Sequence, residues 1–183
     1  MTGARPPYLP GDPVRTGAIA SMIRVDHAGE YGAVRIYDGQ LAVIGPGRAR
    51  DAIRRMAEQE QRHHAQFDEL VRRRQVRPTL LQPLWHLAGY ALGATTALLG
   101  EHAAMACTVA VEEVIDEHYR RQAERLGDAD PEIKETIEEF RADELQHREV
   151  AIAHGATETL GYELISAVVK TGSRLAIWLS ERI

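Results

Sequence analysis

Two short motifs in the sequence combine a carboxylate and an imidazole at the spacing of one helical turn. Glu60 and His63 form the first pair, and Glu144 and His147 form the second. Residues three apart on a helix share a face and lie about 4.5 Å apart along its axis, so each pair can bind one metal ion. A chain of 183 residues with 8 histidines contains about one such pair by chance, so the motifs alone are weak evidence.

Two further glutamates turn these motifs into a repeated pattern. Glu30 lies 30 residues before Glu60, and Glu112 lies 32 residues before Glu144. Each half of the chain therefore carries a glutamate on one helix and Glu-x-x-His on the next. This arrangement indicates an internal duplication of a helical hairpin, which is typical of ferritin-like four-helix bundles with two metals. The six candidate ligands are Glu30, Glu60, His63, Glu112, Glu144 and His147.

Charge balance supports a pair of divalent metal ions. Four buried carboxylates without partners would be prohibitively costly, whereas two divalent cations neutralise them. Mixed carboxylate and imidazole ligands are typical of iron sites and, less often, of manganese sites. Zinc, by contrast, often uses sites rich in thiolate ligands. By analogy with ferritin-like sites, we expect Glu60 and Glu144 to bridge two irons and Glu30 and Glu112 to be terminal ligands. The alternative, six exposed charges on solvated helix faces, is disfavoured by the matched spacing.

Glycine, proline and capping residues divide the chain into helices. Gly45-Pro46-Gly47 is a strong stop, and Asp130 followed by Pro131 is a helix start. No strand pattern of useful length is present, so we predict an all-α fold. The predicted helices are Thr16–Ile44, Arg48–Arg74, Leu84 to about Leu99, Glu101–Leu126, Pro131 to about His154, and Thr159–Ile183.

Composition places these helices in one domain. The length suits a single core, which we expect to span residues 16–183 after a flexible proline-rich leader, residues 1–15. A net charge of −5 gives no overall electrostatic case for nucleic acid. The single cysteine, Cys107, excludes an intramolecular disulfide and fits a reducing compartment. The leader resembles neither a secretory signal nor a transit peptide, so a cytoplasmic bacterial protein is the simplest interpretation.

Several stretches around these ligands resemble the demethoxyubiquinone hydroxylase family of ubiquinone biosynthesis. The most specific is IRVDHAGEYGAVRIY at residues 23–37, and the others are ACTVAVEE at 106–113, His118-Tyr119, EQRH at 60–63 and DELQH at 143–147. The resemblance covers roughly residues 20–155. It implies an oxidoreductase, a di-iron monooxygenase that hydroxylates the ring of a polyprenylated methoxy-methyl-benzoquinol with O₂. It also implies electrons from NADH through the bound quinone, or from a separate reductase.

The resemblance further implies a peripheral protein of the membrane that holds its hydrophobic substrate, here the cytoplasmic face of the bacterial inner membrane. Leu87 to Gly100 is uncharged, but fourteen helical residues span about 21 Å, short of a bilayer core of about 30 Å. Helices 84–99, with Trp85 as an interfacial anchor, and 159–183, with Trp178, are the candidate membrane contacts. Alternatively they pack the core, or serve a homo-oligomer or a biosynthetic complex.

Side chains next to the ligands are candidates for support and proton transfer. We expect Asp143 to reach His63 and Gln59 to reach His147, although both side chains could equally be exposed. Tyr119 and His118 follow Glu112 by seven and six residues and are candidates for proton or electron delivery. Tyr37, the counterpart of Tyr119, is expected only to pack. His27 is either a partner of a ligand or a structural residue, and the remaining histidines are expected at the surface or as caps: His64, His86, His102 and His154.

Two other functions compete with the hydroxylase. A ferritin- or rubrerythrin-like protein would oxidise iron or remove peroxide with the same ligands. The absence of cysteine pairs and the presence of two apolar helices argue against it. A non-catalytic quinone-binding or membrane-scaffold bundle would need no metal at all, so metal content distinguishes it from both enzymes.

Overall fold

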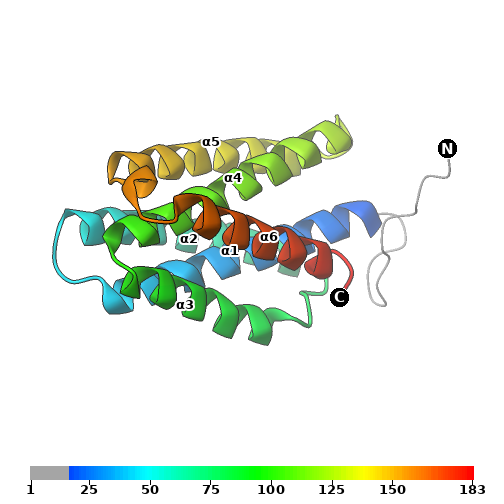
Figure 1. Ribbon diagram of the computed structural model, residues 1–183. Coiled ribbons are helices and arrows are strands. Elements are labelled where there is room, and N and C mark those ends of the chain that lie inside the picture. Colours follow the sequence, from blue (N-terminus) through cyan, green and yellow to red (C-terminus); the bar gives the residue numbers. More distant parts are fainter. Residues whose placement is uncertain (1–16) are drawn as a thin grey trace.

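The computed structural model describes residues 17–183, which form six α-helices and one short 3-10 helix and contain no strand. The predicted all-α class is confirmed, and the predicted leader lies outside the described residues. Figure 1 shows the helices running roughly along one long axis. They are α1 (Gly17–Val43), α2 (Arg48–Arg73), α3 (Gln82–Leu98), α4 (Glu101–Leu126), α5 (Pro131–Ala153), the 3-10 helix η1 (Ala156–Glu158) and α6 (Tyr162–Ser180).

Local chemistry at the helix ends explains most of these bounds. The side chain of Asp130 accepts the backbone N–H of Ile133, and Pro131 occupies the first turn, where its missing N–H costs nothing. Gly100 and Gly127 flank α4 with φ angles of 116° and 53°, which other residues rarely adopt. The ends of α1, α2, α4 and α5 therefore lie within about one residue of the predicted ones.

Two helices differ from the prediction. α3 begins at Gln82 rather than Leu84, because Pro83 fits the first turn of a helix and does not break it. α6 is shorter than predicted at both ends, beginning at Tyr162 and ending at Ser180. Gly155 and Gly161 have φ angles of 82° and 76°, so the chain turns twice and forms η1 before α6 starts.

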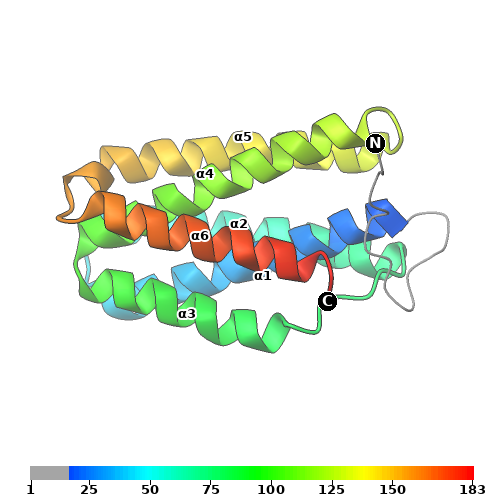
Figure 2. The same ribbon diagram turned by 45° about the vertical axis from the view of Figure 1, so that its right-hand side comes forward.

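The two halves of the chain have the same arrangement of three helices. α1 and α2 form one hairpin, α4 and α5 form the other, and together they make the four-helix bundle (Figure 2). α3 packs on α1, and α6 packs on α4. The duplication inferred from the ligand spacing therefore extends to a third helix in each half. α3 and α6 both lie on the side of the bundle formed by α1 and α4.

α3 lies unusually close to α1 because glycines meet at their contact. A Cβ atom on Gly93 would lie 1.9 Å from the carbonyl oxygen of Ile36, and one on Gly39 would lie 2.2 Å from that of Tyr90. Any side chain at these positions would push the two helices apart. The glycines thus fix the position of α3 on the bundle.

Apolar clusters fill the bundle on both sides of its middle. One cluster contains Ile53, Met56 and Met105, and the other contains Ile23, Phe67 and Phe140. The six candidate ligands fall between the two clusters along each of the four bundle helices. The site is therefore enclosed by apolar side chains at both ends.

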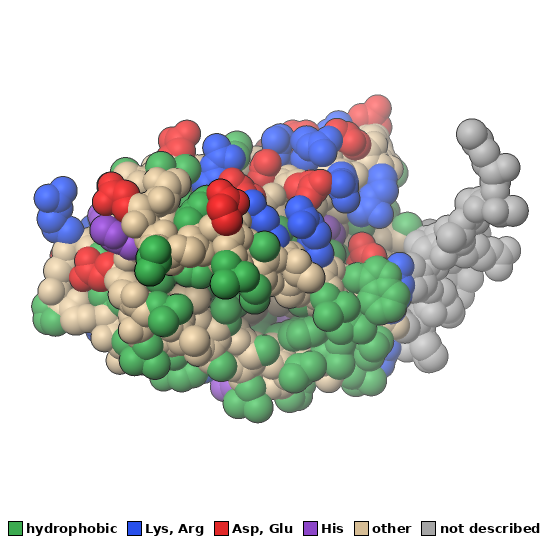
Figure 3. Space-filling view, viewed as in Figure 1, with side chains coloured by type: hydrophobic (Ala, Val, Ile, Leu, Met, Phe, Trp, Pro, Cys, Tyr) green, Lys and Arg blue, Asp and Glu red, His purple; other side chains and the backbone are tan. Residues whose placement is uncertain are grey.

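Large apolar side chains are also exposed on α3, on α6 and beside them. Figure 3 shows hydrophobic side chains gathered over α3 and α6, whereas charged side chains gather over α4 and α5. Among residues 17–183, no helix combines the length and the apolar character needed to cross a membrane. The exposed apolar residues of these segments are Leu80, Leu84, Leu87, Tyr90, Leu98, Leu99, Leu160, Leu164, Val168, Leu175, Trp178 and Ile183.

Candidate metal centre

The six predicted ligands converge in the middle of the bundle, and none is more than 3% exposed. Their nitrogen and oxygen atoms form two groups, each with its atoms within 4.8 Å of one another. One group consists of Glu30, Glu60, His63 and Glu144, and the other consists of Glu60, Glu112, Glu144 and His147. Glu60 and Glu144 belong to both groups. Glu30 and His63, from the first half of the chain, therefore belong to one group alone. Glu112 and His147, from the second half, belong to the other group alone.

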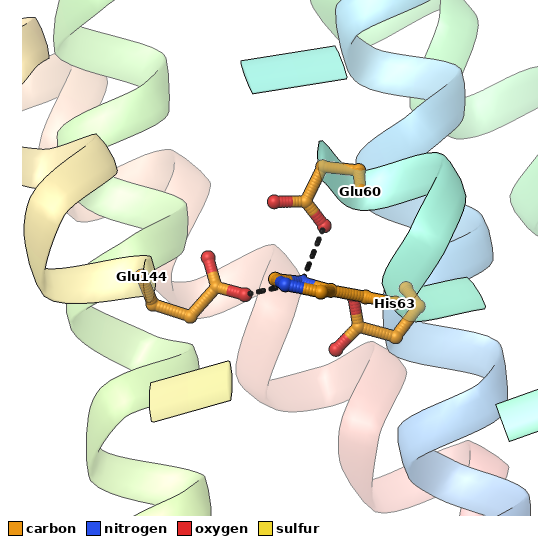
Figure 4. A group of neighbouring side chains, drawn as sticks. Glu60, His63 and Glu144 are labelled. Atoms are coloured by element: carbon orange, nitrogen blue, oxygen red, sulfur yellow. Dashed lines mark ion pairs between the residues drawn. The ribbon is translucent and has the colours of Figure 1, made fainter. Parts of the chain in front are cut away.

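Both histidines direct the same ring nitrogen at the carboxylates. His63 Nδ1 lies 3.4 Å from Glu144 Oε1 and 3.5 Å from Glu30 Oε2. His147 Nδ1 lies 3.0 Å from Glu60 Oε1 and 3.3 Å from Glu144 Oε2. Figure 4 shows the carboxylates of Glu60 and Glu144 approaching the ring of His63 from α2 and α5. This convergence of imidazole nitrogens and carboxylate oxygens is the geometry of a metal centre.

Many of these atoms are buried without a hydrogen-bond partner. Both side-chain oxygens of Glu60 and Glu144, one oxygen each of Glu30 and Glu112, and Nδ1 of both histidines are in this state. Native proteins leave few buried polar atoms unpaired, because each costs about 1–3 kcal/mol or more when charged. Here the unpaired atoms all face one another. Divalent cations bound between them would satisfy all of them, so the donor set fits a site for divalent metal ions.

The pKa shifts show that these acids are unfavourable as carboxylates when no cations are bound. Burial, and then the charge of neighbouring carboxylates, raises the pKa of Glu60 and Glu112 well above its usual range. Burial also raises the pKa of Glu144. For His63, burial disfavours the charged form, yet its contacts with Glu144 and Glu30 outweigh burial and raise its pKa to about 10. Without bound cations these side chains therefore retain protons, which cations would displace.

Side chains from the opposite half orient both histidines. His63 Nε2 lies 3.1 Å from Asp143 Oδ2, and His147 Nε2 lies 3.2 Å from Gln59 Oε1. Both contacts join the residues that the sequence paired. An acceptor at Nε2 keeps a hydrogen on that nitrogen, so Nδ1 is the nitrogen that can bind a cation.

Two tyrosines donate to the glutamates of the opposite half. Tyr119 donates a hydrogen bond to Glu30, and Tyr37 donates to Glu112 Oε1 over 2.8 Å. The prediction that Tyr37 only packs is therefore wrong. Both tyrosines follow a ligand glutamate by two helical turns, which returns them to the same face, and the pseudo-twofold relation exchanges their partners. The duplication could have revealed this contact.

A hydrophobic cavity of about 400 Å³ leads to one side of the centre. It lies between α1, α3, α4 and α6, and its walls include Glu30 and Tyr119. The indole N–H of Trp85 on α3 donates to Ser180 Oγ at the end of α6, over 3.0 Å. The rest of the lining is mainly apolar, including Ile36, Leu92, Val111, Ile115, Val169 and Leu175. An apolar molecule in this cavity would touch a ligand glutamate.

Residues 17–180 match the family model described as "Ubiquinone biosynthesis protein COQ7". The chain belongs to this family. It is 55% identical to the 3-demethoxyubiquinol 3-hydroxylase of Rhodospirillum rubrum over 176 residues, which cover 96% of this chain and 83% of the relative. It is 47% identical to the mitochondrial NADPH-dependent 3-demethoxyubiquinone 3-hydroxylase of Homo sapiens over 176 residues, 94% of this chain and 81% of the relative. The mitochondrial 5-demethoxyubiquinone hydroxylase of Saccharomyces cerevisiae is 43% identical over 179 residues, 88% of this chain and 77% of the relative.

The cavity wall of this member of the ubiquinone biosynthesis family also carries polar residues. His118 lines the cavity and contacts Asp26 and not the ligands, with 3.1 Å between His118 Nε2 and Asp26 Oδ1. Gln122 donates to the same oxygen over 2.8 Å. The sequence analysis missed Asp26 and Gln122. The signal was present, because Asp26 lies one helical turn before Glu30 on the same face.

The other histidines lie away from the ligand cluster. His27 is buried, lies 3.5 Å from Asp68 and packs against the ring of His64, so it is a structural residue of the α1–α2 contact. His64 is half-buried by this contact and was wrongly expected at the surface or as a cap. His86 and His102 are exposed as expected. His154 contacts the carbonyl oxygen of Val150 at the end of α5, as a capping residue does.

Proposed function

We propose that the chain is a di-iron monooxygenase that hydroxylates the ring of demethoxyubiquinol in ubiquinone biosynthesis. The observation that carries the proposal is the pair of overlapping ligand groups at the inner end of an apolar cavity. The names of the relatives support the same substrate and reaction. In the balanced reaction, one atom of O₂ replaces a ring C–H by C–OH. The other atom leaves as water with two protons and two electrons from a reductant.

The six ligands have distinct roles in this proposal. Glu60 and Glu144, which belong to both ligand groups, would hold both irons, whereas Glu30 and His63 would hold one and Glu112 and His147 the other. When bound, the iron pair supplies the two-electron reduction of O₂, a chemistry that side chains lack. Asp143 and Gln59 hold the two imidazoles in place. The apolar clusters on both sides of the ligands exclude water from the centre.

Tyr119 connects the ligand set to the substrate cavity, and His118 lines the same cavity without contacting a ligand. Tyr119 donates its phenol hydrogen to Glu30 and also lines the cavity, so it can hold a proton between the ligand and the bound ring. Tyr37 makes the equivalent contact with Glu112 but does not line the cavity. We therefore assign proton delivery to the half of the site that contains Glu30.

Reduced nicotinamide nucleotides are the proposed source of electrons. The relatives from Dictyostelium discoideum and Homo sapiens are both named NADPH-dependent. Their names support electron supply from a reduced nicotinamide, either through the bound quinone or through a separate reductase.

The exposed apolar side chains support a peripheral position on a membrane, which we place at the cytoplasmic face of the bacterial inner membrane. They occur on α3 and α6, the helices that border the cavity. A polyprenyl chain could thus extend from the cavity into lipid. Trp178 is 51% exposed and fits the role of interfacial anchor, whereas Trp85 uses its N–H within the protein.

Product analysis tests the proposed reaction directly. Iron-loaded protein is incubated with demethoxyubiquinol, isotopically labelled O₂ and a reductant, and the product is analysed by mass spectrometry. We expect one labelled oxygen in a new ring hydroxyl, a result that Glu112→Ala abolishes and that the exposed control His86→Ala retains. Efficient peroxide turnover without hydroxylated product would instead support the iron oxidase or peroxidase alternative.

A further inference from the structure

We propose that Asp26 is a positioning residue that holds His118 as the Nε2–H tautomer, so that its Nδ1 accepts a hydrogen bond from a ring hydroxyl of the bound quinol. The inference rests on the proposed function, because it needs the ring to occupy the cavity beside Glu30. It adds a buried side-chain pair that selects the reduced form of the substrate.

The contacts of Asp26 determine which nitrogen of His118 carries the hydrogen. Asp26 is 3% exposed, and its Oδ1 contacts both His118 Nε2 and the side-chain nitrogen of Gln122, at 3.1 Å and 2.8 Å. The amide of Gln122 is fully buried and donates to this oxygen, so Oδ1 acts as an acceptor. As a carboxylate Asp26 has acceptors alone, so His118 Nε2 donates to it, and a neutral imidazole with its hydrogen on Nε2 has an acceptor at Nδ1.

The second nitrogen of His118 remains available to a ligand. His118 lines the cavity, and Nδ1 has no hydrogen-bond partner among residues 17–183. Because the two ring nitrogens diverge, the contact of Nε2 with Asp26 keeps Nδ1 away from that carboxylate. Of the other hydroxyl groups on the wall, Tyr119 is engaged with Glu30 and Ser180 with Trp85, whereas Ser173 lies on α6, on the opposite helix from His118. His118 thus offers an acceptor next in sequence to the tyrosine that contacts the metal centre.

Such an acceptor has a chemical consequence for a benzoquinol. A ring hydroxyl buried in an apolar cavity needs an acceptor, whereas the oxidised quinone has no O–H to donate. Nδ1 therefore favours the quinol over the quinone. It also fixes the rotation of the ring about its long axis and hence which ring carbon faces the ligands.

Binding of a redox-inert pair of ligands tests the contact without any turnover. The probes are 4-propyl-2-methoxyphenol and its O-methyl ether, measured by calorimetry on protein loaded with Zn²⁺ in place of iron. We expect the phenol to bind about tenfold more tightly than the ether, the usual effect of one hydrogen bond. This ratio should fall to about one in His118→Phe, which has no acceptor, and to a clearly smaller value in Asp26→Leu, in which only part of the His118 rings present an unprotonated Nδ1. Equal affinities in the unmodified protein, or an unchanged ratio in Asp26→Leu, would overturn the inference.

The tautomer of His118 is a second readout that a merely structural role would not change. Nitrogen NMR of the same zinc-loaded, histidine-labelled protein should show His118 as the neutral Nε2–H form. Asp26→Leu should mix the tautomers, whereas Asp26→Asn keeps an oxygen at this position and should restore the Nε2–H form. An Nδ1–H or doubly protonated ring in the unmodified protein would refute the assignment, even if Asp26→Leu does not fold. If the protein does not hydroxylate demethoxyubiquinol, the product analysis described above fails, whereas these binding and NMR measurements, which need no turnover, are unaffected.

Discussion

Glu60 and Glu144 differ from the other ligands because their oxygens belong to both ligand groups. Replacing either by Ala removes oxygens from both metal positions and leaves the remaining buried charges unbalanced. We expect Glu60→Ala to reduce bound iron from two ions per chain to well below one. Glu30→Ala affects one group only and should retain about one ion. Iron analysis after anaerobic loading measures both values.

Glu113 provides the matched control for these ligand variants. It is adjacent to Glu112 but forms an ion pair with Lys170 of α6 near the surface. Glu113→Ala should therefore leave the iron content unchanged. Unaltered iron binding in Glu60→Ala, or equal losses in all three variants, would contradict the bridging assignment.

Tyr37 and Tyr119 allow the two halves of the centre to be compared. Each donates one hydrogen bond to a glutamate proposed as a terminal ligand, and losing such a partner typically weakens metal binding by tenfold or more. Tyr37→Phe and Tyr119→Phe should therefore weaken iron binding to a similar extent. Only Tyr119 lines the substrate cavity. At saturating iron, Tyr119→Phe should lower kcat for hydroxylation, whereas Tyr37→Phe should not; equal kcat values would refute proton delivery through Tyr119.

At the scale of the helices, Gly93 determines how closely α3 approaches α1. A Cβ atom there would overlap the carbonyl oxygen of Ile36, and backbone cannot move aside as a flexible side chain can. We expect Gly93→Ala to lower the free energy of unfolding by about 1–3 kcal/mol. Gly172 on α6 has nothing within 4 Å of its Cβ position, so Gly172→Ala should be neutral or stabilising by up to about 1 kcal/mol. Denaturant unfolding compares the two, and equal destabilisation would show that close packing is not the cause.

The bundle helices were predictable from sequence because their ends carry local signals. Asp130 caps α5 through its own side chain, and Gly100 and Gly127 bound α4. The convergence of the candidate ligands was predictable for a related reason, since helical periodicity and the repeat spacing together place Glu30, Glu60, Glu112 and Glu144 on facing sides.

The placement of α3 and α6 was not predictable in the same way. Their apolar residues occur on several sides, so the sequence does not indicate which side packs on the bundle and which side is exposed. Leu87 is 69% exposed while Gly89 and Gly93 are buried against α1. The cavity depends on this placement, so the contacts of Asp26 and His118 became apparent only from the tertiary structure.

At the scale of the whole molecule, the exposed apolar side chains of α3 and α6 predict how the protein meets lipid. Leu87 and Trp178 are 69% and 51% exposed on these two helices. The double variant Leu87→Glu/Trp178→Glu places charges where acyl chains would otherwise contact the surface. We expect it to bind neutral phospholipid vesicles at least tenfold more weakly than the unmodified protein, as measured by co-sedimentation. Ile152 is 42% exposed on α5, so Ile152→Glu is the control that should bind normally.

The acids and histidines of the centre also make the stability of the whole metal-free chain depend on pH. Glu60, Glu112 and Glu144 have raised pKa values, and that of His63 is raised to about 10, so the folded chain retains protons that the unfolded chain has lost. Stability from such groups is present at low pH and declines as pH rises. Glu30 and His147 have lowered pKa values and act oppositely, but their contribution is already complete above about pH 6.5.

We therefore expect the Tm of the metal-free chain to fall steadily between about pH 7 and pH 9. Bound iron replaces the protons at the carboxylates and at Nδ1 of His63, so the anaerobically loaded chain should lose much less stability over this range. The difference in Tm between the two forms should consequently increase with pH. Differential scanning calorimetry at three pH values measures it. Parallel curves for the two forms would mean that the buried acids are not the metal ligands, because their protons would then not compete with iron.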